Sequence, residues 1–391
     1  MNNRRLALLL VILAAGCGAP VIPATPGASA LTVQGTPTVP APSVPSADPA
    51  AAAEVQALLG RMTAAVLAGD RDAYLALVDL SDPVFAVEQE RWAIDWSDRN
   101  PVTDYTLEVA GLEQEGDLAT GMLTVIWELD PERSAEPWRI TTYVARFTRG
   151  ADGWRYGGEA WASTAAEHFV VRVAPGLEAT VPGIVGVLPD IFDDVTAELG
   201  YEPTGGLEIK LYANANALVA NTLLSLPTIR GWNEPGEALK LVHDPGGPPL
   251  GPTIAHELTH FIGFDRAGTH RTRMPWWLDE GIATYVASTI DDTNASGRLA
   301  QVIDWEADGT LAPWGEMTVF EETPLELWQY VYPQGYAMVR FVTEEYGVVR
   351  RNAWLAAMAT EMDIDEATPA ELGRTFDELD AEFRDWLAAQ R

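Results

Sequence analysis

The segment GPTIAHELTHFIGF, residues 251–264, is the most informative part of the chain. Pro252 suits the first turn of a helix, where the missing N–H has no intrahelical partner. Gly263 suits the end of a helix, because glycine adopts the left-handed conformation that terminates many helices. The sequence therefore predicts a helix between these two residues.

Two histidines and a glutamate on this helix point to metal chemistry. His256 and His260 are about 40° apart around the helix axis and about 6 Å apart along it, so both imidazoles can reach one metal ion. Glu257 lies about 100° round from His256, beside the metal, where its carboxylate can take a proton from an attacking water. The HExxH pattern therefore predicts a hydrolytic metal site. The plainer interpretation, two histidines that cap or pack on a core helix, explains the pattern less well.

A catalytic zinc ion usually takes three protein ligands and leaves one position for water. The segment PWWLDEGIATYVAS, residues 275–288, predicts a second helix that carries Glu280, separated from His260 by 19 residues. This spacing resembles the gluzincin arrangement, and WLDEG resembles the WxxEG motif of that clan. The resemblance implies Glu280 as the third zinc ligand. Asp279 is a weaker alternative, because it points about 100° away on the same helix.

A three-histidine site is the competing arrangement, since HELTHFIGFDR matches the metzincin pattern HExxHxxGxx up to its last position. Arg266 stands at that position. A guanidinium stays protonated and has no lone pair for zinc, and His270 is out of register. The sequence therefore favours the gluzincin arrangement.

Residues 165–391 as a whole resemble the peptidase MA-like domain, a compact gluzincin of exported bacterial proteins, in the order of strands, HELTH, WLDEG and a later YxQG. The resemblance implies a mostly helical domain with a small sheet, and Zn²⁺ as cofactor. It also implies that Tyr332 donates its hydroxyl to the oxyanion of the reaction. A tyrosine packed at a helix start is an equal alternative. Four other residues compete for the role of donor: Tyr330, Tyr336, His243 and His270.

The N-terminal part, residues 51–164, begins with helical apolar spacing and continues with extended segments separated by turns. The sequence predicts two helices and then four strands: Tyr105 to Glu113, Leu118 to Leu129, Trp138 to Arg149 and Trp154 to Trp161. This order indicates an α+β domain and resembles the NTF2-like cone, whose curved sheet surrounds a pocket. Six tryptophans can line such a pocket, but core packing is the more common role of buried aromatics: Trp92, Trp96, Trp127, Trp138, Trp154 and Trp161.

The N-terminus has the layout of a secretory signal, with basic residues, a short apolar stretch and small residues in sequence. LAAGC resembles the lipobox of bacterial lipoproteins, which implies removal of residues 1–16 and lipidation of Cys17, the only cysteine. More than one acyl chain anchors a protein stably to a membrane. The proline-rich stretch over residues 17–50 predicts an extended linker. An irregular N-terminal arm that packs on the protein is the alternative for this linker.

Composition limits the function classes. The chain of 391 residues is 47% apolar, and its formal net charge is -32. Phosphate backbones repel so acidic a chain, so we expect no nucleic-acid partner. No apolar run reaches the roughly 20 residues needed to cross a bilayer, which excludes a multi-pass membrane protein.

Two shorter segments carry structural expectations. Leu239–Val242 is a candidate edge strand that pairs with an extended peptide substrate, although a plain solvated edge is equally consistent with the sequence. Glu361 to Arg391 predicts an amphipathic helix that closes the domain.

Taken together, these patterns predict an exported zinc metallopeptidase, held by lipid on the outer side of the cytoplasmic membrane, that acts on peptide or protein substrates. The alternative is a noncatalytic lipoprotein that binds a ligand or envelope partner through the NTF2-like domain. A third possibility is a zinc enzyme that hydrolyses another kind of amide bond or a peptidoglycan crosslink. Oligomeric state has no signal in the sequence.

Overall fold

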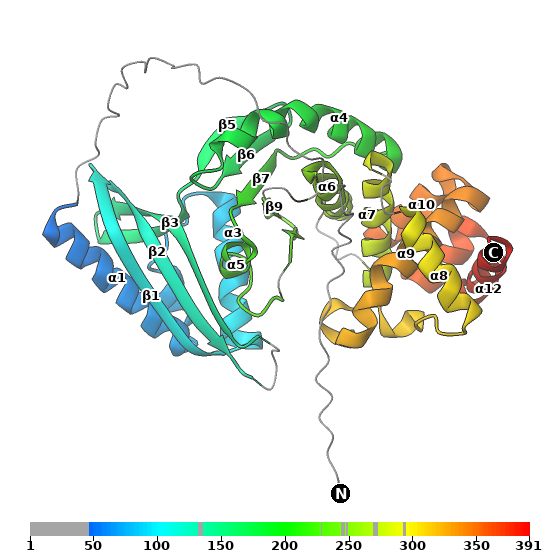
Figure 1. The fold of residues 1–391 in the computed structure, drawn as a ribbon, viewed down its shortest axis with the longest axis horizontal. Coiled ribbons are helices and arrows are strands. Elements are labelled where there is room, and N and C mark those ends of the chain that lie inside the picture. Colours follow the sequence, from blue (N-terminus) through cyan, green and yellow to red (C-terminus); the bar gives the residue numbers. More distant parts are fainter. Residues whose placement is uncertain are drawn as a thin grey trace, which may run out of the picture. The chain divides into compact units, whose positions relative to one another are not determined.

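A computed structural model describes residues 47–131, 136–227, 229–243, 247, 249–268, 273–291 and 295–391. The signal peptide, Cys17 and residues 17–46 of the linker lie outside the described residues, as does His270. All described residues belong to one unit, Val44–Arg391. Helices and strands are mixed in α+β fashion, as the sequence predicts (Figure 1).

The N-terminal part opens with three helices rather than the two expected: α1 (Pro49–Leu67), α2 (Arg71–Leu75) and α3 (Pro83–Ile94). Each follows an aspartate whose side chain accepts a hydrogen bond from a backbone N–H of the first turn: Asp48, Asp70 and Asp82. α1 is long and apolar enough to cross a membrane by length and composition. Its apolar side packs in the protein core, where Val55, Leu58 and Leu59 are fully buried.

The four predicted strands are present and pair in sequence order as an antiparallel meander, sheet A. Their bounds are β1 (Val102–Glu115), β2 (Leu118–Leu129), β3 (Trp138–Gly150) and β4 (Gly153–Glu159). Alternate residues along β2 are buried, and α1 lies across that face (Figure 1). The sheet and the helix therefore share one core.

Most of the tryptophans in this part belong to the core and do not line an open pocket. Trp92, Trp96, Trp127 and Trp154 are at most 4% exposed, whereas Trp138 is 59% exposed. The space enclosed between the helices and the sheet is only ≈ 10 Å³. Aromatic rings therefore fill the interior of this domain.

A segment from later in the chain helps to fill it. Helix α5 (Ala215–Ala220) and the residues after it pack in the same core as sheet A. Trp92 Nε1 donates to the carbonyl of Ala220 over 2.9 Å, and Trp127 Nε1 donates to the carbonyl of Leu224 over 3.1 Å. These bonds satisfy two buried indoles and tie the two halves of the described chain together.

Sheet B has the order β5-β6-β7-β9-β8. Its strands are β5 (Ala162–Ala165), β6 (Phe169–Val173), β7 (Leu207–Tyr212), β8 (Gly231–Trp232) and β9 (Leu239–Val242). Strands β6, β7 and β9 are parallel, and α4 (Val181–Leu199) connects β6 to β7 and ends at Gly200. The expectation that Leu239–Val242 forms an edge strand is wrong: β9 lies between β7 and β8, and all four of its residues are buried.

The two lysines of the chain, Lys210 and Lys240, are both buried in sheet B beneath helix α3. Lys210 Nζ lies 2.5 Å from Glu88 Oε2, and Lys240 Nζ lies 3.6 Å from Glu88 Oε1. Lys240 also contacts Glu237 over 2.5 Å, and Arg91 contacts the same carboxylate over 3.0 Å. Charges this deeply buried persist only when paired, so this network fixes α3 against sheet B.

The C-terminal part is mostly helical, and its larger helices gather in one bundle (Figure 1). They are α6 (Leu250–Ala267), α7 (Trp276–Ile290), α8 (Ala295–Ala307), α9 (Trp328–Tyr346), α10 (Val348–Thr360) and α12 (Phe376–Ala389). The prediction that α6 ends at Gly263 is wrong. The helix continues to Ala267 and ends at Gly268, whose φ of 57° suits glycine alone.

The closing helix is shorter than expected. The segment from Glu361 divides into α11 (Ile364–Ala367), a π-helical turn (Thr368–Leu372) and α12. Gly373, with φ 73°, separates the last two. The apolar side of α12 is buried as predicted, with Leu379, Phe383 and Leu387 fully enclosed in the helical core.

Candidate metal centre

Helix α6 presents His256 and His260 toward the same point. Their Nε2 atoms are 3.2 Å apart, and the rings meet nearly edge to face at a centroid distance of 4.8 Å. His260 is 6% exposed, while His256 is more accessible. The spacing of four residues therefore places both imidazoles at one site, as the sequence predicts.

Glu280 on α7 completes the group. Its Oε2 lies 3.1 Å from His256 Nε2 and 3.5 Å from His260 Nε2. Ligand atoms placed tetrahedrally about 2.0–2.1 Å from a zinc ion are about 3.3 Å from one another. The three side chains therefore fit a zinc ion in donor type and in mutual spacing. Among the described residues no other group of three such side chains comes together.

Asp279 and Trp276 hold the candidate ligands in place. Asp279 Oδ2 lies 3.2 Å from His260 Nδ1, on the far side of the ring from the cluster. Trp276 Nε1 donates to Glu280 Oε1 over 3.0 Å, which leaves Oε2 directed at the histidines. Partners of this kind fix the tautomer of a histidine ligand and the orientation of a carboxylate. Asp279 thus lies behind His260, whereas Glu280 faces the site.

The two glycines of the WLDEG and YPQG segments bring α7 and α9 together beside the site. A Cβ on Gly281 would lie 2.6 Å from the carbonyl carbon of Gly335. A Cβ on Gly335 would lie 2.1 Å from the carbonyl oxygen of Trp277. Real Cβ atoms do not approach other atoms so closely, so the helices can cross here only at glycine. This crossing sets the position of Glu280.

Glu257 lies on the neighbouring face of α6 and is 5% exposed. A Cβ on Gly231 of β8 would come within 2.1 Å of Glu257 Oε1, so glycine is required where this strand passes the carboxylate. Burial raises the pKa of Glu257, and the two histidines only partly oppose that shift. The carboxylate is therefore a better proton acceptor than one in water.

The charged groups of the cluster shift one another's pKa values. Burial alone would disfavour ionisation of Glu280, but the charge of His260 and hydrogen bonds from both histidines hold its pKa below the usual range. Burial likewise disfavours protonation of His260, yet Asp279 and Glu280 raise its pKa well above the usual value. The lowered pKa of Glu280 and the raised pKa of His260 have one cause, because the site places carboxylates around buried imidazoles. Such a site attracts a cation.

Tyr332 on α9 is the candidate oxyanion donor that the structure brings to the same cavity. Its ring centroid lies 6.3 Å from that of His256. Tyr332 is 38% exposed, but desolvation of its hydroxyl and the nearby carboxylates of Glu280 and Glu257 raise its pKa well above the usual value, so the hydroxyl stays protonated and can donate. The other described candidates lie elsewhere: Tyr330 packs on Trp305, Tyr336 on Tyr285, and His243 lines a different cavity.

The cavity at the cluster has a volume of ≈ 200 Å³. Beyond the predicted residues, its wall includes Trp232, Asn233, Glu234, Phe320 and Trp328. Sequence reasoning missed Glu234, because a single glutamate in a loop-rich stretch carries no spacing signal. Burial raises its pKa to about 7. The contact between Trp276 and Glu280 has a signal in the sequence, because residues four apart on a helix lie side by side.

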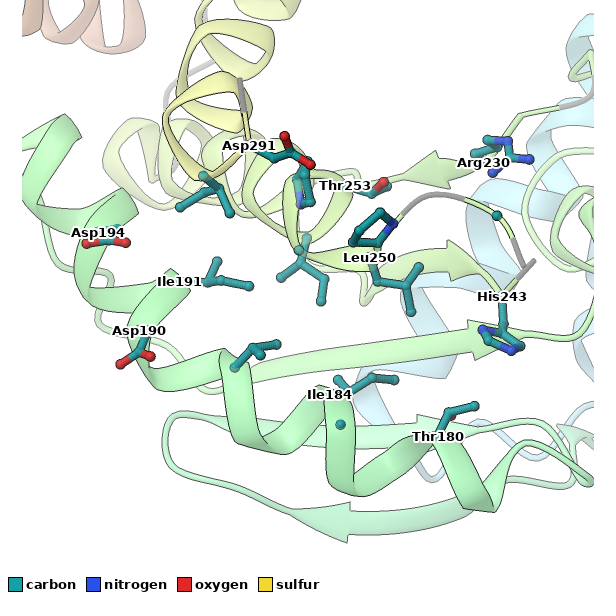
Figure 2. Close-up of a pocket in the computed structure, with 18 of the residues that line it drawn as sticks. Thr180, Ile184, Asp190, Ile191, Asp194, Arg230, His243, Leu250, Thr253 and Asp291 are labelled. Atoms are coloured by element: carbon teal, nitrogen blue, oxygen red, sulfur yellow. The ribbon is translucent and has the colours of Figure 1, made fainter. Parts of the chain in front are cut away.

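A larger cavity, of ≈ 730 Å³, lies elsewhere (Figure 2). Ile184 and Ile191 of α4 face Leu250 at the start of α6 across it, with Asp190 and Asp194 beside them on α4. None of His256, Glu257, His260 and Glu280 lines this cavity. Size alone therefore does not identify the reactive site in this chain.

Comparison with solved structures gives low scores. A protein described as a candidate aromatic ring hydroxylase from Novosphingobium aromaticivorans is 15% identical, with a TM-score of 0.21 over 28% of this chain and 86% of that chain. Rv3472 of Mycobacterium tuberculosis, of unknown function, is 20% identical, with a TM-score of 0.19 over 27% of this chain and 66% of that chain. Native yeast LTA4 hydrolase is 11% identical, with a TM-score of 0.39 over 70% of this chain and 64% of that chain. These scores are too low to support an inference.

Comparison with protein families is more specific. No curated protein matches the chain. The family model of the peptidase MA superfamily matches residues 251–389, which include the histidine helix, Glu280 and Tyr332. The match covers the helices that build the site and agrees with the resemblance seen in the sequence. Residues 251–389, about a third of the chain, are therefore similar to the peptidase MA superfamily.

Proposed function

We propose that the chain is a zinc-dependent metallopeptidase in which His256, His260 and Glu280 hold the metal ion. The observation that carries this proposal is the mutual distance of 3.1–3.5 Å between the three ligand atoms. A bound zinc ion lowers the pKa of a water ligand from 15.7 to about 7 and polarises a carbonyl group. The remaining chemistry belongs to the side chains around it.

Glu257 is the general base of the proposed reaction. Its buried carboxylate has a raised pKa, so it takes a proton from the attacking water more readily than an exposed glutamate does. The same carboxyl group then passes the proton to the leaving amine, which makes amine departure possible at neutral pH. Gly231 leaves room for this carboxylate to stay in place during both transfers.

Tyr332 is the proposed donor to the oxyanion. Its phenol keeps its proton because three carboxylates nearby disfavour a phenolate. A hydroxyl that donates to negative charge as it develops on the substrate oxygen stabilises the transition state more than the ground state. We expect Tyr332→Phe to lower kcat more strongly than it changes KM.

The decisive experiment combines metal analysis with a generic protein-cleavage assay on the full-length protein in detergent. Glu257→Gln should abolish hydrolysis and retain one zinc per chain, because Glu257 is not a ligand. Glu326→Gln, at an exposed position outside the cavity, is the matched control and should keep full activity. Undiminished cleavage by Glu257→Gln would refute its role as base.

The same assay separates the competing functions. A noncatalytic ligand-binding lipoprotein would show no cleavage with or without chelator. A zinc hydrolase of another amide would bind zinc but leave proteins and peptides intact. The intact set of base and three candidate ligands supports the peptidase, since a binding scaffold has no need of Glu257 buried beside them.

We also propose that the mature protein is anchored through lipid on Cys17, outside the cytoplasmic membrane. The support is the arrangement of basic, apolar and small residues before that cysteine. Cys17→Ser should shift the protein from the membrane fraction to the soluble fraction in cells. Continued membrane retention of that variant after a high-salt wash would contradict the anchor.

A further inference from the structure

A polar cavity of ≈ 300 Å³ lies away from the metal centre, where β4 of sheet A ends and the chain crosses to β5 of sheet B. The start of α3 contributes Asp82 and Phe85 to its wall, and β3 contributes Arg146. Glu159 at the end of β4 and Trp161 just after it complete this side. The cavity is distinct from the filled interior of the N-terminal domain.

Three of the residues that line this cavity carry a fully buried polar atom without a hydrogen-bond partner in the described part of the chain: Nε of Arg146, Nε of Arg172 and Oε2 of Glu159. Glu159 is only 3% exposed. A buried polar group without a partner costs about 1–3 kcal/mol, and more when it is charged. Three such atoms around one cavity indicate that the wall is built to receive a polar molecule.

The other charges of the wall are already paired. Arg172 Nη2 lies 2.7 Å from Asp82 Oδ2 and 2.9 Å from Glu208 Oε2. Lys210 Nζ lies 2.5 Å from Glu88 Oε2. By contrast, Arg146 makes one hydrogen bond within the described ranges of the chain, of 3.3 Å, to the carbonyl of Gly157. Arg146 therefore keeps most of its donors for another partner.

Two consecutive glycines shape this wall. A Cβ on Gly157 would lie 2.9 Å from Arg146 Nε, so the guanidinium occupies the space a side chain would need. Gly158 has φ 82° and faces the ring of Phe85, where a Cβ would lie 2.7 Å from Cε2. The pair thus fixes Arg146 on one side of the strand and Phe85 on the other.

The unpaired groups act as donors. Both arginine Nε atoms carry a proton at any physiological pH. Burial raises the pKa of Glu159 to about 8, and Lys210 opposes this only partly, so the carboxyl group is protonated at neutral pH and also donates. Phe85 and Trp161 add apolar surface to the same wall. Donors beside aromatic rings match an anionic oxygen group attached to an apolar body.

We propose that this cavity binds a small carboxylate with an apolar body. The carboxylate accepts hydrogen bonds from Arg146 and Glu159, and the body packs against Phe85 and Trp161. The ligand would lie between α3, sheet A and sheet B, at the junction that the buried lysine network also stabilises. This site does not depend on the metal centre, so its test is independent of peptidase activity.

The test is calorimetric titration of the full-length protein in detergent with benzoate, and with benzamide as the neutral counterpart of the same shape. Benzoate should bind with at least about tenfold higher affinity than benzamide, because charge-assisted hydrogen bonds are stronger than neutral ones. Inorganic phosphate tests whether any oxyanion suffices. Preference for phosphate, or for the cation benzylamine, would overturn the assignment of a carboxylate.

Variants locate the binding site. Arg146→Gln and Gly157→Ala should each weaken benzoate binding at least about tenfold, the second by displacing the guanidinium. Glu159→Gln should bind benzoate within a few-fold of the unaltered protein, since the amide keeps a donor. Arg155→Gln is the matched control, because Arg155 lies on β4 like Gly157 and Glu159 but is 46% exposed and contacts Asp152 at the surface.

Thermal unfolding keeps the proposal falsifiable if a variant folds poorly. Benzoate should raise the Tm of the unaltered protein and of Arg155→Gln, and should leave that of Arg146→Gln unchanged. An equal rise of Tm in Arg146→Gln, or no benzoate binding by folded unaltered protein at millimolar concentration, would overturn the proposal.

Discussion

Replacement of Gly335 by alanine probes the helix crossing on which the metal centre depends. The added Cβ would lie 2.1 Å from the carbonyl oxygen of Trp277 and 3.0 Å from the Cα of Gly281. Both contacts are with backbone, which cannot rotate out of the way as a side chain can. Helices α7 and α9 must therefore separate by about 1 Å to restore ordinary van der Waals distances.

Two opposing effects set the size of the change in stability. Overpacking typically costs about 1–3 kcal/mol, and contact with rigid backbone places this site at the upper end. Alanine in a helix interior gains about 1 kcal/mol over glycine. The free energy of unfolding should therefore fall by about 2 kcal/mol. Because Glu280 lies next to Gly281, a shift of about 1 Å should also weaken zinc binding and lower cleavage by about 100-fold.

Urea unfolding of chelator-treated protein, followed by circular dichroism, measures the first effect, and zinc competition with a coloured chelator measures the second. Gly263→Ala is the matched control, because this glycine also lies inside a helix of the metal centre but has no atom within 4 Å of the added Cβ. It should gain about 0.5–1 kcal/mol. Equal stabilisation by both substitutions would refute the close crossing.

Three further predictions address the surroundings of the site. Lys210→Met should lower the free energy of unfolding by about 3–5 kcal/mol in urea titrations, because it removes the nearest ion-pair partner of the buried Glu88 carboxylate. Asp279→Asn should lower zinc affinity about 10–100-fold in chelator competition by releasing His260; unchanged affinity would show that Asp279 does not orient the ring. The raised pKa of Glu159 means that the folded state holds a proton that the unfolded state loses above about pH 4.5. Glu159 should therefore lower the free energy of unfolding by a few kcal/mol between about pH 4.5 and 8, and Glu159→Gln should make the pH slope in urea titrations shallower, leaving the part that Glu234 contributes.

The parts of the site that follow from local geometry could be predicted from the sequence. The spacing of His256 and His260 fixes their relative placement on any α-helix, and the structure brings their Nε2 atoms within 3.2 Å. Strand β2 also has the predicted bounds, Leu118–Leu129, because turn residues end its alternating apolar pattern on both sides.

What the sequence left open depends on contacts between distant segments. β8 has only two residues, too few for any periodicity, yet it forms the sheet edge beside Glu257. Gly263 resembles a helix end in isolation, but contacts along α6 keep the helix intact to Ala267. The filled interior of the N-terminal domain likewise depends on α5, which lies far along the chain from the tryptophans it covers.

Metal content of the purified full-length protein tests whether His256, His260 and Glu280 form a zinc site. We expect one zinc ion per chain by mass spectrometry, and less than a tenth of that in Glu280→Ala protein that remains folded. Absence of stoichiometric zinc from the folded protein in zinc-supplemented buffer, or full zinc occupancy in Glu280→Ala, would contradict the proposed metal centre.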